Sequence, residues 1–262
     1  MKALFFDVDG TLVNSENEIP KSAYDAIRAT REAGNLVFIN SGRCYCMMTS
    51  LKDKIDVDGL LCGCGTEIIY KGESVYSNVL SYDVRKRVIE AADKYDVEII
   101  AEGHDGAVVS VTYEESRMDD MKTTLEMIRK FDTAFGGEFA PEFEFAKFCI
   151  QADDKSDVEG FKAEFEKDFE VMDRYNGFFE CVPLGHSKGT AVDWVLKKFD
   201  IAPEDAYVFG DSTNDLSMFK VSGVNAIAMK KHDKELDEYA TYVTDAVEND
   251  GVKKAMEHFG LI

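Results

Sequence analysis

The chain has 262 residues, 45% of them apolar, and its 51 acidic side chains outnumber its 30 basic ones to give a net charge of −21. This composition is that of a folded protein, and the length allows one large domain or two ordinary ones. The negative balance argues against nucleic acid and against an anionic membrane surface as partners, because binding to either requires a basic patch. A small anionic substrate would need a local cationic pocket.

The start of the chain offers only four apolar residues before Asp7. That run is too short for the apolar region of a signal peptide or for a membrane span, so we expect a cytoplasmic protein. A chain of this length does not depend on disulfides, so we expect its cysteines to be reduced; they stand at positions 44, 46, 62, 64, 149 and 181.

Short apolar runs alternate with stretches of helical period in the first and last thirds of the chain. The runs cover residues 4–6, 36–39, 59–61 and 206–209. Between the first two, Pro20 opens a helical stretch and Gly34 stands where a helix would end. Further helices are expected from Ser187 to Lys198 and from Thr213. This rhythm predicts βαβ units around a mostly parallel, buried sheet.

The middle of the chain has a different pattern, in which the expected strands look antiparallel. They cover residues 98–101, 107–111, 145–151, 169–174 and 178–182, and helices are expected over 82–95, 116–131 and 156–167. The aromatic residues of this part are expected to form its core: Phe131, Phe135, Phe139, Phe143, Phe145 and Phe148. The predicted fold class is therefore α/β, with a Rossmann-like, mostly parallel core of residues 1–81 plus 184–262 and an inserted α+β cap of residues 82–183.

Four short segments carry the candidate chemistry, and three of them follow predicted core strands, where open α/β sheets place their ligands. The first is Asp7-Val8-Asp9-Gly10-Thr11. Its two carboxylates leave the strand together, so that one can attack while the other handles protons, and its glycine permits a sharp turn. A polar strand end followed by a turn would explain this segment alone equally well.

The other three segments are Asn40-Ser41-Gly42-Arg43, Ser187-Lys188-Gly189 and Gly210-Asp211-Ser212-Thr213-Asn214-Asp215. A hydroxyl followed by a helix N-terminus can hold an anion, a lysine supplies a cation, and carboxylates four residues apart meet on one helical face. Each segment alone is also explained by helix capping or an exposed lysine. Their occurrence together, in this order, is the specific signal.

These four segments resemble the motifs of the haloacid dehalogenase superfamily, which begin with Asp-x-Asp-x-Thr and end with Gly-Asp-x-x-Asn-Asp. The insertion between the second and third motifs, and the stretch 210–219, look like those of the Cof-type phosphatases with a type IIB cap. Residues 243–252 are similar to the family's closing stretch, so the likeness covers essentially the whole chain. One departure is Cys62-Gly63-Cys64-Gly65, where many relatives have Asn-Gly-Ala.

The resemblance implies a Mg²⁺-dependent phosphatase that acts on small phosphorylated metabolites, with sugar phosphates favoured. It implies that Asp7 attacks phosphorus to give an aspartyl-phosphate, and that Asp9 protonates the leaving oxygen and then activates water. Ser41, the backbone at Gly42, and Lys188 would bind the phosphoryl oxygens.

The same resemblance implies the metal ligands, which would be the Asp7 carboxylate, the Asp9 carbonyl and Asp211. Lys188 would also orient Asp7, and Thr11 would support the first loop. Asn214 would contact phosphate or Asp7, and Asp215 would act at the metal site mainly through its neighbours.

Alternatives remain open at this point. A phosphomutase would use the same carboxylates, and a protein that only senses phosphate esters would bind one without turnover. The pairs Cys44/Cys46 and Cys62/Cys64 could converge on a structural zinc ion, but our hypothesis is sensitivity to oxidation without a metal. The sequence does not indicate the physiological substrate or the oligomeric state.

Overall fold

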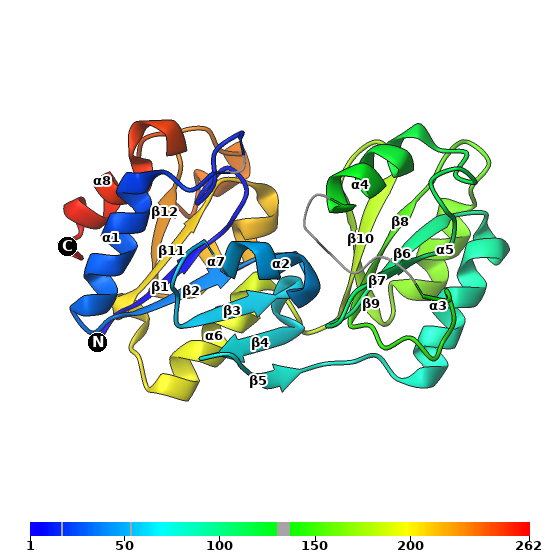
Figure 1. Ribbon diagram of the computed structural model, residues 1–262, viewed down its shortest axis with the longest axis horizontal. Helices are drawn as coiled ribbons and strands as arrows, with labels where there is room; N and C mark the ends of the chain where they lie inside the picture. Colours follow the sequence, from blue (N-terminus) through cyan, green and yellow to red (C-terminus); the bar gives the residue numbers. More distant parts are fainter. Residues whose placement is uncertain (17, 53, 130–136) are drawn as a thin grey trace. The chain divides into compact units, whose positions relative to one another are not determined.

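The computed structural model describes residues 1–262 except 17, 53 and 130–136, and leaves the side chains of 49, 50 and 52 aside (Figure 1). It divides into two compact units, one of residues 1–42, 51–75 and 186–262 and the other of residues 43–50 and 76–185. The expected domain boundaries, 1–81 plus 184–262 and 82–183, stay a prediction. No helix among the described residues is long and apolar enough to cross a membrane.

The first unit is built on a sheet in the strand order β13-β12-β11-β1-β2-β3-β4-β5. All neighbours from β13 to β3 are parallel, and β4 returns antiparallel to β3. The strands are β1 (Ala3–Phe6), β2 (Leu36–Asn40), β3 (Gly59–Cys62), β4 (Glu67–Tyr70), β5 (Glu73–Ser77), β11 (Ala206–Gly210), β12 (Asn225–Ala228) and β13 (Tyr242–Val243).

The helices of this unit lie beside one another in two pairs, α1 with α8 and α6 with α7. Their bounds are α1 (Lys21–Glu32), α6 (Lys188–Phe199), α7 (Leu216–Phe219) and α8 (Gly251–His258). The α2 helix (Tyr45–Lys52) follows β2 and belongs mostly to the second unit. The α1 helix buries Ala23, Ala26 and Ile27, as its spacing predicts. The stretch after Thr213 differs from the expected helix, because it begins as a 3₁₀ turn, Thr213–Asp215, before α7.

The second unit contains an antiparallel sheet in the order β7-β6-β8-β10-β9. Its strands are β6 (Glu98–Glu102), β7 (Ala107–Val109), β8 (Lys147–Gln151), β9 (Phe169–Asp173) and β10 (Phe178–Pro183), and its helices are α3 (Tyr82–Tyr95), α4 (Asp119–Arg129) and α5 (Val158–Phe165). The predicted fold class, a mostly parallel α/β core with an inserted antiparallel α+β module, is confirmed.

Aromatic side chains fill one side of this second sheet. Phe145 and Phe148 are fully buried there with Phe161 and Phe165 of α5, and Phe139 and Phe143 pack against them. Phe131 and Phe135, also expected in this core, lie outside the described residues. A second apolar cluster joins Met121 and Leu125 of α4 to Ile100 of β6 and to the Cys44–Met47 stretch.

Candidate active site

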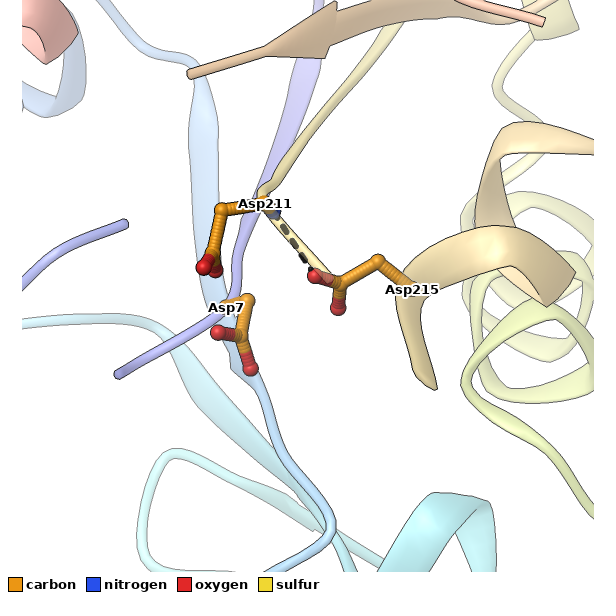
Figure 2. Close-up of side chains that lie close together, drawn as sticks. All are labelled: Asp7, Asp211 and Asp215. Carbon is orange, nitrogen blue, oxygen red and sulfur yellow. Dashed lines mark hydrogen bonds between the residues drawn. The ribbon is translucent and has the colours of Figure 1, made fainter. Parts of the chain in front are cut away.

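The candidate site lies in the first unit, where β1 and β11 end side by side. These strands are parallel neighbours in register, with Phe6 opposite Phe209, so the residues that follow them meet at one edge of the sheet. Asp7 comes directly after β1 and Asp211 directly after β11, and Figure 2 shows their carboxylates close together with that of Asp215. One oxygen of each lies within 4.8 Å of one oxygen of both others.

Lys188 brings a single cation to these carboxylates from the first turn of α6. Its side chain is wholly buried, and its Nζ donates to Asp7 Oδ1 at 2.5 Å, to Asp215 Oδ1 at 2.6 Å and to Asn214 Oδ1 at 3.3 Å. A capping box at Ser187 fixes the start of this helix and therefore the direction in which the lysine leaves it.

The first loop is shaped by Gly10 and Thr11. Gly10 has a φ of +80°, and a Cβ added there would lie 2.4 Å from Asp211 Oδ2, so both the backbone and the space require glycine. Thr11 is buried and its hydroxyl donates to Asp211 Oδ1 at 3.1 Å. Asp9 is exposed on this loop, which is closed by a β-bridge between Asp9 and Val13.

Asp215 organises the fourth motif from inside. Its carboxylate is fully buried, and its Oδ2 accepts a hydrogen bond from the backbone N–H of Asp211 at 2.9 Å (Figure 2). The same oxygen accepts the N–H of Ser212 at 3.1 Å. Its other oxygen accepts from Lys188. The residue therefore fixes the loop that carries Asp211 and the position of the lysine at the same time.

The charges in this cluster do not balance, since one lysine faces three carboxylates. Burial, with the nearby Asp215, raises the pKa of Asp7 to about 8 even though Lys188 opposes the shift. Burial and Asp215 likewise raise the pKa of Asp211 to about 7. The pKa of Lys188 is also raised, because the attraction of Asp215 and Asp7 outweighs the effect of burial.

A divalent cation would relieve this excess of negative charge. The ligand atoms on offer are all carboxylate oxygens, which suit a hard ion such as Mg²⁺. Burial and the nearby Asp215 carboxylate, which raise the pKa values of Asp7 and Asp211, would both be offset by such an ion. The donor set therefore fits the expected metal. Within the described residues, this is the group of three or more His, Cys, Asp and Glu side chains that has the spacing of a metal site.

Ser41 and Gly42 follow β2, the other parallel neighbour of β1. Ser41 is buried; its N–H donates to the Leu61 carbonyl at 2.9 Å, and its own carbonyl accepts from Cys64 N–H at 3.0 Å. The unusual Gly63–Gly65 turn therefore supports the serine loop from the next strand. All of the predicted site residues except Asp9, Ser41 and Gly42 are joined directly by the contacts described above.

Two residues to which the sequence analysis gave no role also bond to this cluster. Asn40, the last residue of β2, is fully buried and its Nδ2 donates to the Lys188 carbonyl at 2.9 Å. Asp233 bonds to the backbone of the fourth motif at the Asp211 carbonyl and at the Thr213 N–H. The sequence signal for Asn40 was a polar residue at the end of an apolar strand. The signal for Asp233 was an acidic residue shortly after β12, the strand that follows the fourth motif.

Two polar side chains of the second unit, Glu102 and His104, have partners within that unit. Glu102 is buried and lies 3.1 Å from Lys147 Nζ, and His104 stacks on Tyr45 with ring centroids 4.5 Å apart. The six cysteines are all buried and none forms a disulfide. The hypothesis that oxidation affects activity stays a prediction.

A family model described as haloacid dehalogenase-like hydrolase matches residues 4–256. A 5-amino-6-(5-phospho-D-ribitylamino)uracil phosphatase of Bacillus subtilis, YwtE, is 26% identical over 96% of both chains. A phosphoglycolate phosphatase of Methanothermobacter thermautotrophicus is 25% identical over 99% of both. Among solved structures, the subclass IIB sugar phosphatase BT4131 superimposes with a TM-score of 0.81 at 26% identity, covering 100% of both chains.

Proposed function

Because this chain belongs to the haloacid dehalogenase-like hydrolases and is a phosphatase of small phosphomonoesters, we propose that it hydrolyses sugar phosphates or similar metabolites through a phosphorylated Asp7. The observation that carries the proposal is the cluster of Asp7, Asp211 and Asp215, in which Lys188 Nζ pairs with Asp7 and Asp215. The sugar phosphatase among the similar structures supports the substrate class.

In the first proposed step, a carboxylate oxygen of Asp7 forms a bond to phosphorus while the bond from phosphorus to the leaving oxygen breaks. Asp9 gives that oxygen its proton, so the alcohol leaves neutral. The exposed position of Asp9, two residues beyond Asp7 on the same loop, suits a group that must exchange protons with substrate and water.

In the second step, a water molecule loses a proton to Asp9 and attacks phosphorus, and the bond between phosphorus and Asp7 breaks. This releases phosphate and restores both carboxyl groups to their starting states. Lys188 holds one Asp7 oxygen at 2.5 Å, which orients the nucleophile. We assign Lys188, Ser41 and the Gly42 backbone to the phosphoryl oxygens, where they would stabilise charge in the transition state.

Asp7, Asp211 and the Asp9 carbonyl would hold Mg²⁺, with Thr11 and Asp215 supporting the site and Asn214 near the phosphate or Asp7. When bound, this ion would neutralise the repulsion between the attacking carboxylate and the phosphoryl oxygens. We also propose that residues 82–183 act as the cap that restricts access to small substrates. A cytoplasmic location stays a prediction from the sequence.

The test is a panel of phosphorylated sugars and other small metabolites, assayed for released phosphate with Mg²⁺ and with EDTA. We expect turnover only with the metal, and Asp7→Asn should lower kcat by at least about a thousandfold because the nucleophile is gone. Thermal unfolding of the variant controls for its folding. A rate like that of the wild type in this variant would remove Asp7 as nucleophile.

The same panel separates the two alternatives. Conversion of a hexose phosphate into its positional isomer through a bisphosphate, without net release of phosphate, would make the protein a phosphomutase. Tight binding of an ester without any turnover in the presence of Mg²⁺ would make it a sensor.

A further inference from the structure

The loop after β12 reaches the candidate site from the side opposite to β1. β12 is the other parallel neighbour of β11, with Ala228 opposite Gly210, so its carboxyl end lies at the same edge of the sheet. Asp233 stands on this loop. Its N–H donates to the carbonyl of Asp211 at 2.8 Å, and its Oδ2 accepts the N–H of Thr213 at 2.8 Å.

These two bonds hold the backbone directly after Asp211, the residue that we assign to the metal. One fixes the peptide at Asp211 itself, and the other satisfies an otherwise unpaired N–H at the start of the Thr213–Asp215 turn. Asp215 holds the same turn from its buried side. The fourth motif is therefore clamped between an internal carboxylate and one supplied from the next strand.

The Asp233 loop is itself anchored. The ring of His232 is only 11% exposed. Its Nδ1 lies 2.5 Å from the Met229 carbonyl, and its Nε2 lies 3.0 Å from Asp237 Oδ1. Leu236 is fully buried. Because the loop is anchored at these points, Asp233 keeps a defined position beside the fourth motif.

We propose that Asp233 is a positioning residue of the metal site, which orients Asp211 through its backbone and adds negative charge beside it. The inference rests on the proposed function, since it needs Asp211 to be a metal ligand. The charge lies close to that ligand, because the Asp233 carboxylate accepts the Thr213 N–H two residues beyond Asp211. Outer carboxylates of this kind govern metal affinity without touching the ion.

The exposure of Asp233 makes the inference testable, because replacing an exposed side chain leaves no buried charge behind. Asp233→Asn keeps an oxygen that can accept the Thr213 N–H but removes the charge. Asp233→Ala removes both. Glu235→Gln is the matched control, since it removes one negative charge from an exposed residue of the same loop.

The experiment measures Mn²⁺ binding to the substrate-free protein by electron paramagnetic resonance, together with the Mg²⁺ concentration that half-saturates activity. We expect the dissociation constant for Mn²⁺ to rise about tenfold in Asp233→Ala, about threefold in Asp233→Asn and less than about twofold in Glu235→Gln. Activity of Asp233→Asn should return to near the wild-type rate at saturating Mg²⁺, which a general loss of folding would not allow.

Two failures are distinguishable. If the wild type binds Mn²⁺ and Asp233→Ala binds it equally well while unfolding at the same temperature, the role of Asp233 is wrong and the proposed function stands. If the wild type binds no Mn²⁺, or Asp211→Asn binds it unchanged, the metal site of the proposed function is wrong, and the inference falls with it.

Discussion

Asn40 connects two parts of the candidate site that lie 148 residues apart in the chain. It ends β2 beside Ser41, and its amide donates to the backbone carbonyl of Lys188 from a fully buried position. Burying an amide costs free energy unless it is hydrogen-bonded, and an apolar side chain could fill the same space without that cost. The bond to Lys188 must therefore offset the burial of the amide. The bond fixes the point from which the lysine leaves α6.

We predict that Asn40→Ala lowers both stability and turnover. The hydrogen bond between the Asn40 amide and the Lys188 carbonyl would be lost, which costs about 1 kcal/mol, and a displaced lysine would reduce kcat. Urea unfolding and steady-state kinetics measure the two effects.

Asn225→Ala is the control, because the Asn225 amide also donates to backbone carbonyls, those of Glu204 and Ala206. Asn225 is the first residue of β12, whereas the candidate site lies at the other end of the parallel strands. It should lose stability with kcat unchanged. Equal kcat for the two variants would show that Asn40 has no influence on the lysine.

Gly10 offers a second prediction at this scale. Gly10→Ala should reduce activity by more than about a hundredfold, because its methyl group would collide with the Asp211 carboxylate as well as strain a φ of +80°. Gly34→Ala separates the two causes, since Gly34 has a φ of +87° with nothing within 4 Å of an added Cβ. It should lose about 1–2 kcal/mol of stability and keep its kcat. Phosphate release and thermal unfolding give both readings.

Among the elements, the antiparallel sheet of the second unit contains buried ion pairs. Lys147 of β8 lies 2.6 Å from Glu180 of β10, and Arg174 donates to the other Glu180 oxygen at 2.7 Å. Burial alone would raise the pKa of Glu180, but Lys147 and Arg174 lower it to about 2. These ion pairs link neighbouring strands, and breaking one would leave an unpaired charge in the interior, which destabilises the fold.

The pH dependence of this contribution follows from the lowered pKa. Between about pH 4.5 and pH 2 the unfolded chain binds a proton at Glu180 that the folded protein does not, so the stabilisation is complete above this window and is lost as the pH falls through it. Glu180→Gln should therefore cost about 3 kcal/mol at pH 7 and progressively less below pH 4.5. Denaturant unfolding at pH 7, 5, 4 and 3 measures the difference.

Glu90→Gln serves as the comparison, because Glu90 pairs with Lys86 only at the surface, at 3.8 Å. Its effect should stay below about 0.5 kcal/mol throughout. A constant difference between wild type and Glu180→Gln over the whole range would contradict the assignment of the ion pair.

At the scale of the whole molecule, the net charge of −21 and the unbalanced acidic cluster act in the same direction. Bringing three carboxylates together costs folding free energy, and an ion that binds only the folded protein returns part of it. We predict that removing metal with EDTA lowers the unfolding temperature and that Mg²⁺ restores it. At a Mg²⁺ concentration a hundred times the dissociation constant, the bound ion should add about 2.7 kcal/mol to the free energy of unfolding. Calorimetry with and without Mg²⁺ measures this.

Asp211→Asn should abolish most of the metal effect, and its metal-free form should be more stable than the metal-free wild type, since one repelling charge is gone. A Mg²⁺ response unchanged in this variant would place the ion elsewhere.

The sequence by itself determined the fold class and the family, because the strand periodicity and the order of the four motifs are local patterns. It also indicated that Asp7 and Asp211 would meet, since parallel strands bring their carboxyl ends to one edge. Their catalytic roles stay proposals.

Only the tertiary structure decided the support for these residues. Asp233 reaches the fourth motif because β12 lies beside β11 in the sheet. Asn40 joins β2 to Lys188 because its amide points towards α6. Hydrogen bonds between distant segments depend on strand order and side-chain direction, and both are set by packing of the whole unit, which no local pattern in the chain encodes.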